Sequence, residues 1–87
     1  MGLVIDGLRD RLTAVFQPTR LEIVDESDKH AGHAGASEAG ESHLSVFIES
    51  AAFAGLGRVA RQRLVNAAAA EAFAAGLHAL SIRAEAP

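Results

Sequence analysis

Cysteine, tryptophan and tyrosine are all missing from this sequence of 87 residues. Without cysteine, the chain has no disulfide framework, no CxxC redox pair, no thiol nucleophile and no thiolate metal ligand of its own. A site for iron, zinc or copper must therefore use histidine, which is a versatile ligand for these metals, or take its sulfur ligands from a partner. The lack of thiols thus limits both the catalytic and the metal-binding classes open to this chain.

Long hydrophobic runs are missing as well. No apolar segment approaches the roughly 20 residues that a membrane-spanning helix needs. The N-terminal residues MGLVIDGLRDRL include acidic side chains and lack the basic start and apolar run of a secretory signal. We therefore expect a cytoplasmic protein that is not integral to a membrane.

An excess of positive charge is also absent, because 8 Lys and Arg residues stand against 11 Asp and Glu residues and give a formal net charge of −3. This balance argues against a domain whose main role is non-specific phosphate binding, although it is compatible with a local basic patch. A chain of this length fits one small domain. Since no internal repeat is visible, residues 1–87 are expected to form a single domain.

Hydrophobic periodicity predicts elements in the order helix, strand, strand, helix, strand. The helices are expected over residues 3–16 and 57–74, and the strands over residues 20–25, 42–49 and 77–83. Pro18 ends the first helix because proline cannot continue the hydrogen-bond ladder. Gly76 lies where a left-handed cap of the second helix is expected. Two helices packed on three strands make an α+β two-layer sandwich.

The sheet is expected to be mixed. The first two strands can pair antiparallel, whereas the third strand follows a crossover helix and is expected to pair parallel with one of them. The side chains predicted to pack are Val4, Ile5, Leu8, Leu12, Val15 and Phe16 in the first helix, Leu21, Ile23, Leu44, Val46 and Ile48 in the first two strands, Phe53, Leu56, Val59, Leu64, Val65 and Phe73 around the second helix, and His78, Leu80 and Ile82 on one face of the last strand.

A long connection separates the first two strands. Residues 26–41, ESDKHAGHAGASEAGE, contain three glycines, two histidines and no large apolar side chain. Loops longer than about 12–15 residues are uncommon in compact domains and are usually functional or disordered. This Gly- and His-containing loop is therefore the most informative local feature of the sequence.

Five segments of the chain resemble the BolA family, in the same order and at similar intervals over nearly the whole length. They are residues 21–27 (LEIVDES) with His30, residues 40–44 (GESHL), residues 53–55 (FAG), residues 61–65 (RQRLV) and residues 77–81 (LHALS). Gln62 departs from the family, which usually has histidine between the two arginines, and Asn66 departs from a common aromatic residue or histidine. The chain also ends at Pro87, about where many members have one more helix.

The resemblance implies a class II KH-like αββαβ fold and a non-enzymatic role. Family members pair with monothiol glutaredoxins, share a [2Fe–2S] cluster with them, and take part in iron–sulfur cluster assembly and trafficking or in iron homeostasis. Some relatives are described as DNA-binding transcriptional regulators, which gives an alternative function that uses the second helix. The implied partners are a monothiol glutaredoxin and, in the alternative, DNA. Alone, the chain is expected to be a monomer or a weak homodimer.

The resemblance also implies that His78 and His30 supply imidazole ligands to the shared cluster, with His33 close enough to replace His30. Imidazole can take the place of cysteine on one iron of a [2Fe–2S] cluster, and the other iron then needs thiolates from a glutaredoxin cysteine and glutathione. Without the resemblance, the residues themselves favour a partly buried structural role for His78, bonded to backbone, and solvated loop positions for His30 and His33. His43 is expected to be a surface or structural residue and is left out of the ligand set.

Three arginines, Arg58, Arg61 and Arg63, lie in the first half of the second helix. At 100° per residue, Arg58 and Arg61 are neighbours and Arg63 lies on the far side. They form either a solvated helix face paired with the protein's own acids or a surface for phosphate or a partner protein. The Gly55–Gly57 segment lacks the GxxG spacing with which KH domains clamp a nucleic-acid backbone, and no aromatic platform for bases accompanies it.

No catalytic pair is visible in the sequence. Ser42 and His43 are adjacent, but adjacent residues of a strand face opposite sides of a sheet and cannot act as nucleophile and base. Asp25, Glu26 and Glu41 bracket the long loop as charges that favour its solvation. We therefore expect a protein that is not an enzyme.

Overall fold

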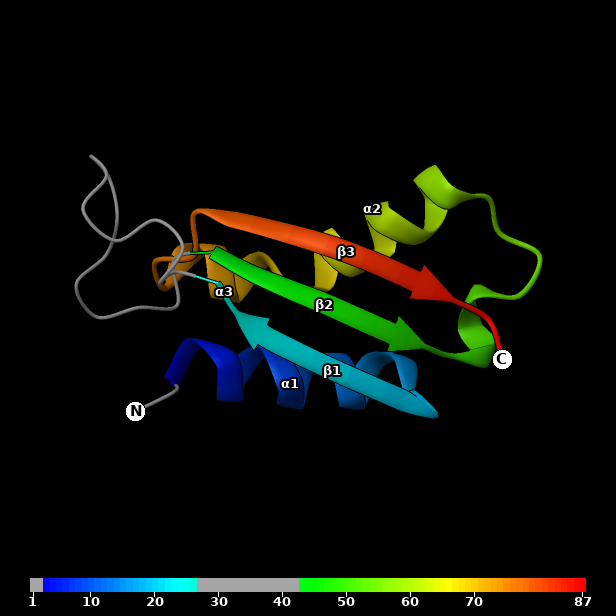
Figure 1. The fold of residues 1–87 in the computed structure, drawn as a ribbon, viewed down its shortest axis with the longest axis horizontal. Coiled ribbons are helices and arrows are strands. Elements are labelled where there is room, and N and C mark those ends of the chain that lie inside the picture. The colour runs from blue at the N-terminus through cyan, green and yellow to red at the C-terminus, as the bar shows by residue number, and fades with distance from the viewer. Residues whose placement is uncertain (1–2, 27–42) are drawn as a thin grey trace.

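The computed structural model describes residues 3–26 and 43–87 of the chain (Figure 1). Its elements are α1 (Leu3–Phe16), β1 (Arg20–Asp25), β2 (His43–Glu49), the short 3-10 helix η2 (Ala51–Phe53), α2 (Arg58–Ala68), α3 (Ala70–Ala74) and β3 (Ala79–Glu85). This order agrees with the predicted αββαβ arrangement, with the second helical segment divided in two. Of the helices in these ranges, none has the length and apolarity needed to cross a membrane.

The three strands form one mixed sheet in the order β1-β2-β3. β1 pairs antiparallel with β2, so that Asp25 lies opposite Leu44, and β2 pairs parallel with β3, so that His43 lies opposite Ala79. In Figure 1 the helices lie behind the sheet, with α1 behind β1 and α2 beside β3. One face of the sheet is therefore covered and the other is open, which confirms the two-layer α+β sandwich.

The core lies between the covered sheet face and the helices. Alternate residues of β2 point into it, since successive side chains of a strand face opposite sides. The large buried side chains that were predicted to pack are Leu8, Leu12, Phe16, Leu44, Val46, Ile48, Phe53 and Val65. The rings of Phe16 and Phe53 pack with their centroids 5.0 Å apart, which joins the end of α1 to the segment that leads into α2.

Four of the apolar side chains predicted to pack are exposed instead. They are Val15, Val59, Leu64 and Phe73. The helical segment after Gly57 is so rich in alanine that several of its faces have similar hydropathy, and periodicity alone does not identify the face that meets the sheet. Val15 lies at the edge of the apolar stripe of α1. Tertiary packing therefore selects a narrower buried stripe than the sequence pattern indicates.

Ala69 divides the helix that was predicted over residues 57–74. Its N–H is shared between the carbonyl oxygens of Val65 and Asn66, at 3.0 and 3.1 Å, and its backbone has φ −88° and ψ 5°. Alanine favours helix without specifying the course of that helix. Because Ala69 is fully buried, packing against the core determines where one helix ends and the next begins.

Gly76 terminates α3 in the way that the sequence predicts. The N–H of Leu77 donates to the carbonyl oxygen of Ala72 (3.1 Å), the N–H of Gly76 donates to that of Phe73 (3.2 Å), and Gly76 has φ +125°. These bonds form a Schellman motif, which favours glycine because of the positive φ. The motif buries Leu77 and leaves the next residue, His78, exposed before β3 begins.

The last strand therefore begins two residues later than predicted. β3 covers Ala79–Glu85 rather than residues 77–83, and the residues on its covered face are Leu80, Ile82 and Ala84. The prediction that His78 shares this face with Leu80 and Ile82 is wrong, because the Schellman turn places His78 outside the strand. His78 is accordingly an exposed side chain at one end of the sheet.

Candidate functional site

Two histidines meet at the end of the sheet where β2 and β3 begin. Parallel strands start at the same end of a sheet, and the register of β2 and β3 pairs His43 with Ala79. His78, one residue before Ala79, is therefore brought next to His43. Their ring centroids are 6.3 Å apart with an interplanar angle of 50°. His78 is exposed and His43 is half-buried, so a binding partner can reach the pair.

The long loop is attached to the same end of the sheet. β1 runs antiparallel to β2, so its last residues lie beside the first residues of β2. The N–H of Glu26 donates to the carbonyl oxygen of His43 (2.8 Å), and the Ser45 hydroxyl donates to the Glu26 carboxylate (2.7 Å). The predicted ligands His30 and His33 follow Glu26 in the sequence and lie outside the described residues.

The described residues can supply two imidazoles but not a complete metal site. Two imidazoles on one tetrahedral metal ion have ring centroids roughly 5 Å apart when each nitrogen lies about 2.0–2.1 Å from the metal. The observed 6.3 Å separation of His43 and His78 is close enough for side-chain rotation to reach that geometry. Within residues 3–26 and 43–87 there is no group of three or more His, Asp or Glu side chains that could hold a metal. The arrangement therefore suits a shared site whose other ligands come from elsewhere.

Sequence reasoning left His43 out of the ligand set. The structure nevertheless brings it beside His78, and no periodicity within either segment could have indicated this. The only usable signal was the position of His43 as the first residue of a strand that pairs parallel with the last strand. That signal requires the register of β2 and β3, which comes from their packing in the sheet.

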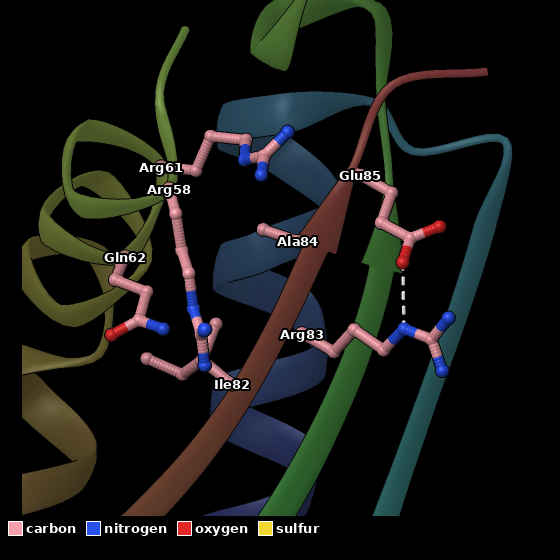
Figure 2. A pocket seen from close by; sticks show the side chains of 7 residues that line it. All are labelled: Arg58, Arg61, Gln62, Ile82, Arg83, Ala84 and Glu85. Atoms are coloured by element: carbon pink, nitrogen blue, oxygen red, sulfur yellow. Dashed lines mark hydrogen bonds and ion pairs between the residues drawn. The ribbon is translucent and has the colours of Figure 1, made fainter.

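A second candidate site lies between α2 and β3, toward the opposite end of β3. This site is a cleft of about 350 Å³. The residues that line it, drawn in Figure 2, are Arg58, Arg61, Gln62, Ile82, Arg83, Ala84 and Glu85. Arg58 and Arg61 extend from α2 toward β3. Arg63 is exposed and does not line the cleft. The structure thus brings two of the three predicted arginines together and separates the third.

The charged groups of β3 are engaged with each other. The Nε of Arg83 donates to a carboxylate oxygen of Glu85 at 2.6 Å, and the dashed line in Figure 2 joins these side chains on the side of β3 away from α2. The guanidinium of Arg83 also lies 5.6 Å from the ring centroid of Phe47 on the open sheet face. Arg58 and Arg61 have no ion pair or hydrogen bond from their side chains to any residue that the structure describes.

Comparison with known proteins gives a consistent family assignment. A family model described as BolA-like protein matches residues 12–87. A Sinorhizobium sp. relative, an uncharacterized protein from the cobS 5′ region, is 46% identical over 83 residues, covering 94% of this chain and 89% of the relative. A Vibrio cholerae relative, named DNA-binding transcriptional regulator BolA, is 41% identical over 80 residues, covering 92% and 72%.

The fold of a solved structure agrees with these relatives. The BolA domain of SufE1 from Arabidopsis thaliana superimposes with a TM-score of 0.87 at 38% sequence identity, and the match covers 100% of this chain and 95% of that domain. Similarity of both sequence and fold therefore extends over the sheet, over the helices and over both candidate sites.

Proposed function

This chain belongs to the family of BolA-like proteins, and from that membership we propose that it binds a monothiol glutaredoxin and holds a [2Fe–2S] cluster together with it. The chain contributes imidazole ligands, and the glutaredoxin cysteine and glutathione contribute thiolates. The role of the complex is iron–sulfur cluster assembly and trafficking or iron homeostasis. When bound, the cluster supplies iron and sulfide that can be passed to a client protein.

The exposed position of His78 beside His43 is the observation that carries this proposal. A ligand shared with a second protein must be accessible, and His78 is exposed at the end of the sheet. The chain has no cysteine, so one iron can take only imidazole nitrogen from it, whereas the other iron needs sulfur from the partner. His78 acts as the first ligand in this proposal.

The second imidazole has three candidates. The family resemblance favours His30, with His33 as its substitute, and both are tethered to this end of the sheet through Glu26. His43 is the alternative that the geometry adds, because its ring lies beside that of His78. Whichever residue serves, a site divided between two proteins loses its ligands when they separate, and this favours transfer of the cluster over permanent storage.

The test is to mix this protein with a cluster-loaded monothiol glutaredoxin and glutathione, and to record visible absorption and circular dichroism. We expect a new circular dichroism spectrum for the wild type and loss of that change for His78→Ala. Separate His30→Ala, His33→Ala and His43→Ala variants identify the second ligand by which of them loses the change. Ser81→Ala, an exposed β3 residue, is the matched control. An unchanged spectrum on mixing, or a His78→Ala spectrum equal to the wild type, contradicts the proposal.

A second candidate function is DNA binding through α2. Two observations favour it: Arg58 and Arg61 have no partner among the residues that the structure describes, and the Vibrio cholerae relative is named a DNA-binding transcriptional regulator. In a gel-shift experiment, Arg58→Ala and Arg61→Ala are expected to weaken DNA binding and its dependence on salt. Binding that is insensitive to both substitutions counts against this function.

A further inference from the structure

We propose that the cleft between α2 and β3 binds a small phosphorylated molecule through its phosphate group, with Arg58 and Arg61 as the anion-binding side chains. The cleft has a volume of about 350 Å³. Figure 2 shows Arg58 extending from α2 along the cleft toward Ile82, with Gln62 beside it, and Arg61 extending from α2 toward the side of Ala84. This site is distinct from the histidine pair and does not depend on the proposed role in cluster binding.

The first argument for an anion site is the positive charge of the cleft. The chain as a whole is acidic, with a formal net charge of −3, and three of its other arginines are paired with carboxylates: Arg9 with Asp6, Arg20 with Glu22, and Arg83 with Glu85. Arg58 and Arg61 have no such pairing within the described residues. The two positive charges on one wall of the cleft are therefore available to an anion from outside the chain.

The second argument is that the Nε–H of Arg61 lacks a hydrogen-bond acceptor among the described residues, although it is buried. Leaving a buried donor without a partner costs about 1–3 kcal/mol, and buried polar groups in native proteins nearly always have a partner. The planar fork of a guanidinium binds two oxygens of a phosphate at once through Nε and one Nη. Rotation of the outer side chain of Arg61 would present this fork to the cleft.

The N-terminus of α2 adds to the positive electrostatic potential of the cleft. Gly57, at the N-cap, has no side chain with which to cap the helix, and the first turn of α2 contains no acidic residue. The positive end of the helix dipole is thus left without a capping side chain and without an acidic residue in the first turn of α2. Its contribution supports the two arginines and is secondary to them.

The size and lining of the cleft favour a small molecule over a nucleic-acid strand. Its volume lies near the lower end of the range for small-molecule sites, about 300–1,000 Å³. Ile82 and Ala84 give it an apolar wall for the organic part of a ligand. No aromatic ring lines the cleft for base stacking, and Arg63 lies outside it, so the basic residues form one point of attachment and not a track along a strand.

The experiment titrates the full chain with pyrophosphate as the probe and follows binding by calorimetry and backbone amide NMR. We expect saturable one-to-one binding, with chemical shift changes centred on residues 58–62 and 82–85. Arg58→Gln and Arg61→Gln are each expected to weaken binding by about tenfold or more, as the loss of a charge-assisted hydrogen bond predicts. Arg63→Gln, on the same helix but outside the cleft, is the matched control and is expected to bind like the wild type.

Three outcomes overturn the proposal. The first is the absence of saturable pyrophosphate binding up to about 10 mM, a concentration well above ordinary metabolite affinities. The second is equal weakening by Arg63→Gln and Arg61→Gln, which would mean diffuse electrostatic attraction. The third is that a short oligonucleotide binds far more tightly than pyrophosphate and that Arg63→Gln weakens it, which would assign α2 to a nucleic-acid surface.

Discussion

The imidazole rings of His43 and His78 lie 6.3 Å apart between centroids, although the two residues belong to different strand ends and are distant in the sequence. The parallel register of β2 and β3 creates this relationship, because it pairs His43 with Ala79. One ring is exposed and the other is half-buried. The pair is therefore accessible at one side and supported by the sheet at the other.

The first prediction is that the two rings bind a zinc ion together. In a titration with Zn²⁺ alone, the imidazole ¹⁵N signals of both His43 and His78 should shift in parallel. His78→Ala should weaken Zn²⁺ binding by more than about tenfold, since substitution of groups that only orient a ligand already costs about 10–100-fold. A titration that shifts His78 and leaves His43 unaffected would show that the pair does not act as a unit.

The loop histidines provide the control for that experiment. A His30→Ala, His33→Ala double variant retains the ring pair of the sheet, so the parallel shifts of His43 and His78 should persist in it. If the shifts disappear in this variant, the loop histidines and not His43 supply the second nitrogen.

The second prediction concerns Ser50, the buried polar side chain that joins α1 to the segment after β2. Its hydroxyl donates to the carbonyl oxygen of Phe16 (2.6 Å) and accepts the N–H of Ala52 (3.1 Å). Ser50→Ala removes both bonds and leaves a buried carbonyl without that donor, so we expect a loss of about 2–3 kcal/mol in the free energy of unfolding. Urea denaturation measures this loss. Ser81→Ala, at an exposed position, should change stability by less than about 0.5 kcal/mol, and a similar value for Ser50→Ala would contradict the role of these bonds.

The third prediction compares the substitution of glycine by alanine at Gly7 and at Gly76. At both Gly7 and Gly76, no atom of the described residues from outside the local backbone lies within 4 Å of the position that a new Cβ would take, so steric contact does not distinguish them. Gly76 has φ +125°, and Gly76→Ala should lower the free energy of unfolding by about 1 kcal/mol or more because an L-residue is strained there. Gly7→Ala, inside α1, should raise it by about 0.5–1 kcal/mol through helix propensity. Thermal unfolding of the two variants should show shifts of opposite sign.

The fourth prediction compares Phe53 and Phe73, which the sequence pattern predicts to pack in the same way. Phe53 is fully buried against Phe16, whereas Phe73 is 37% exposed. Phe53→Ala should cost about 3–5 kcal/mol in the free energy of unfolding, because it removes apolar contacts and leaves a cavity. Phe73→Ala should cost less than half as much, since alanine also favours the helix. Equal losses in urea denaturation would mean that Phe73 is buried in solution.

The elements follow from short-range chemistry, and the sequence predicts them well. Alternation in residues 20–25 predicts β1 with its observed bounds, and Pro18 predicts the end of α1, which the structure places at Phe16. Gln17 takes φ +45° between them, so that the chain turns before the proline. Gly76 predicts the helix cap for the same kind of reason, because only local backbone geometry is needed. Alternation in β2 likewise predicts which of its side chains are buried.

These local sequence patterns do not show how the helices and strands pack against one another. The alanine-rich segment contains too little contrast in hydropathy to show that Val59, Leu64 and Phe73 face outward. The Schellman turn places His78 outside β3, which begins at Ala79. Alternation of apolar and polar residues indicates a strand but does not locate its first residue. The angular positions of Arg58, Arg61 and Arg63 on one helix were predictable, but the wall of β3 that faces two of them was not.

The sequence by itself determined that the chain has no thiol to offer a metal, that its elements run αββαβ, and that a histidine-bearing connection follows the first strand. Composition and local periodicity suffice for these conclusions because they depend on residue types and on neighbours within a few positions. Only the tertiary structure decided that His43 lies beside His78, and that Arg58 and Arg61 face β3 without an acidic partner in residues 3–26 and 43–87. Both relationships join residues from separate elements, so they exist only once strand register and helix packing bring those elements together.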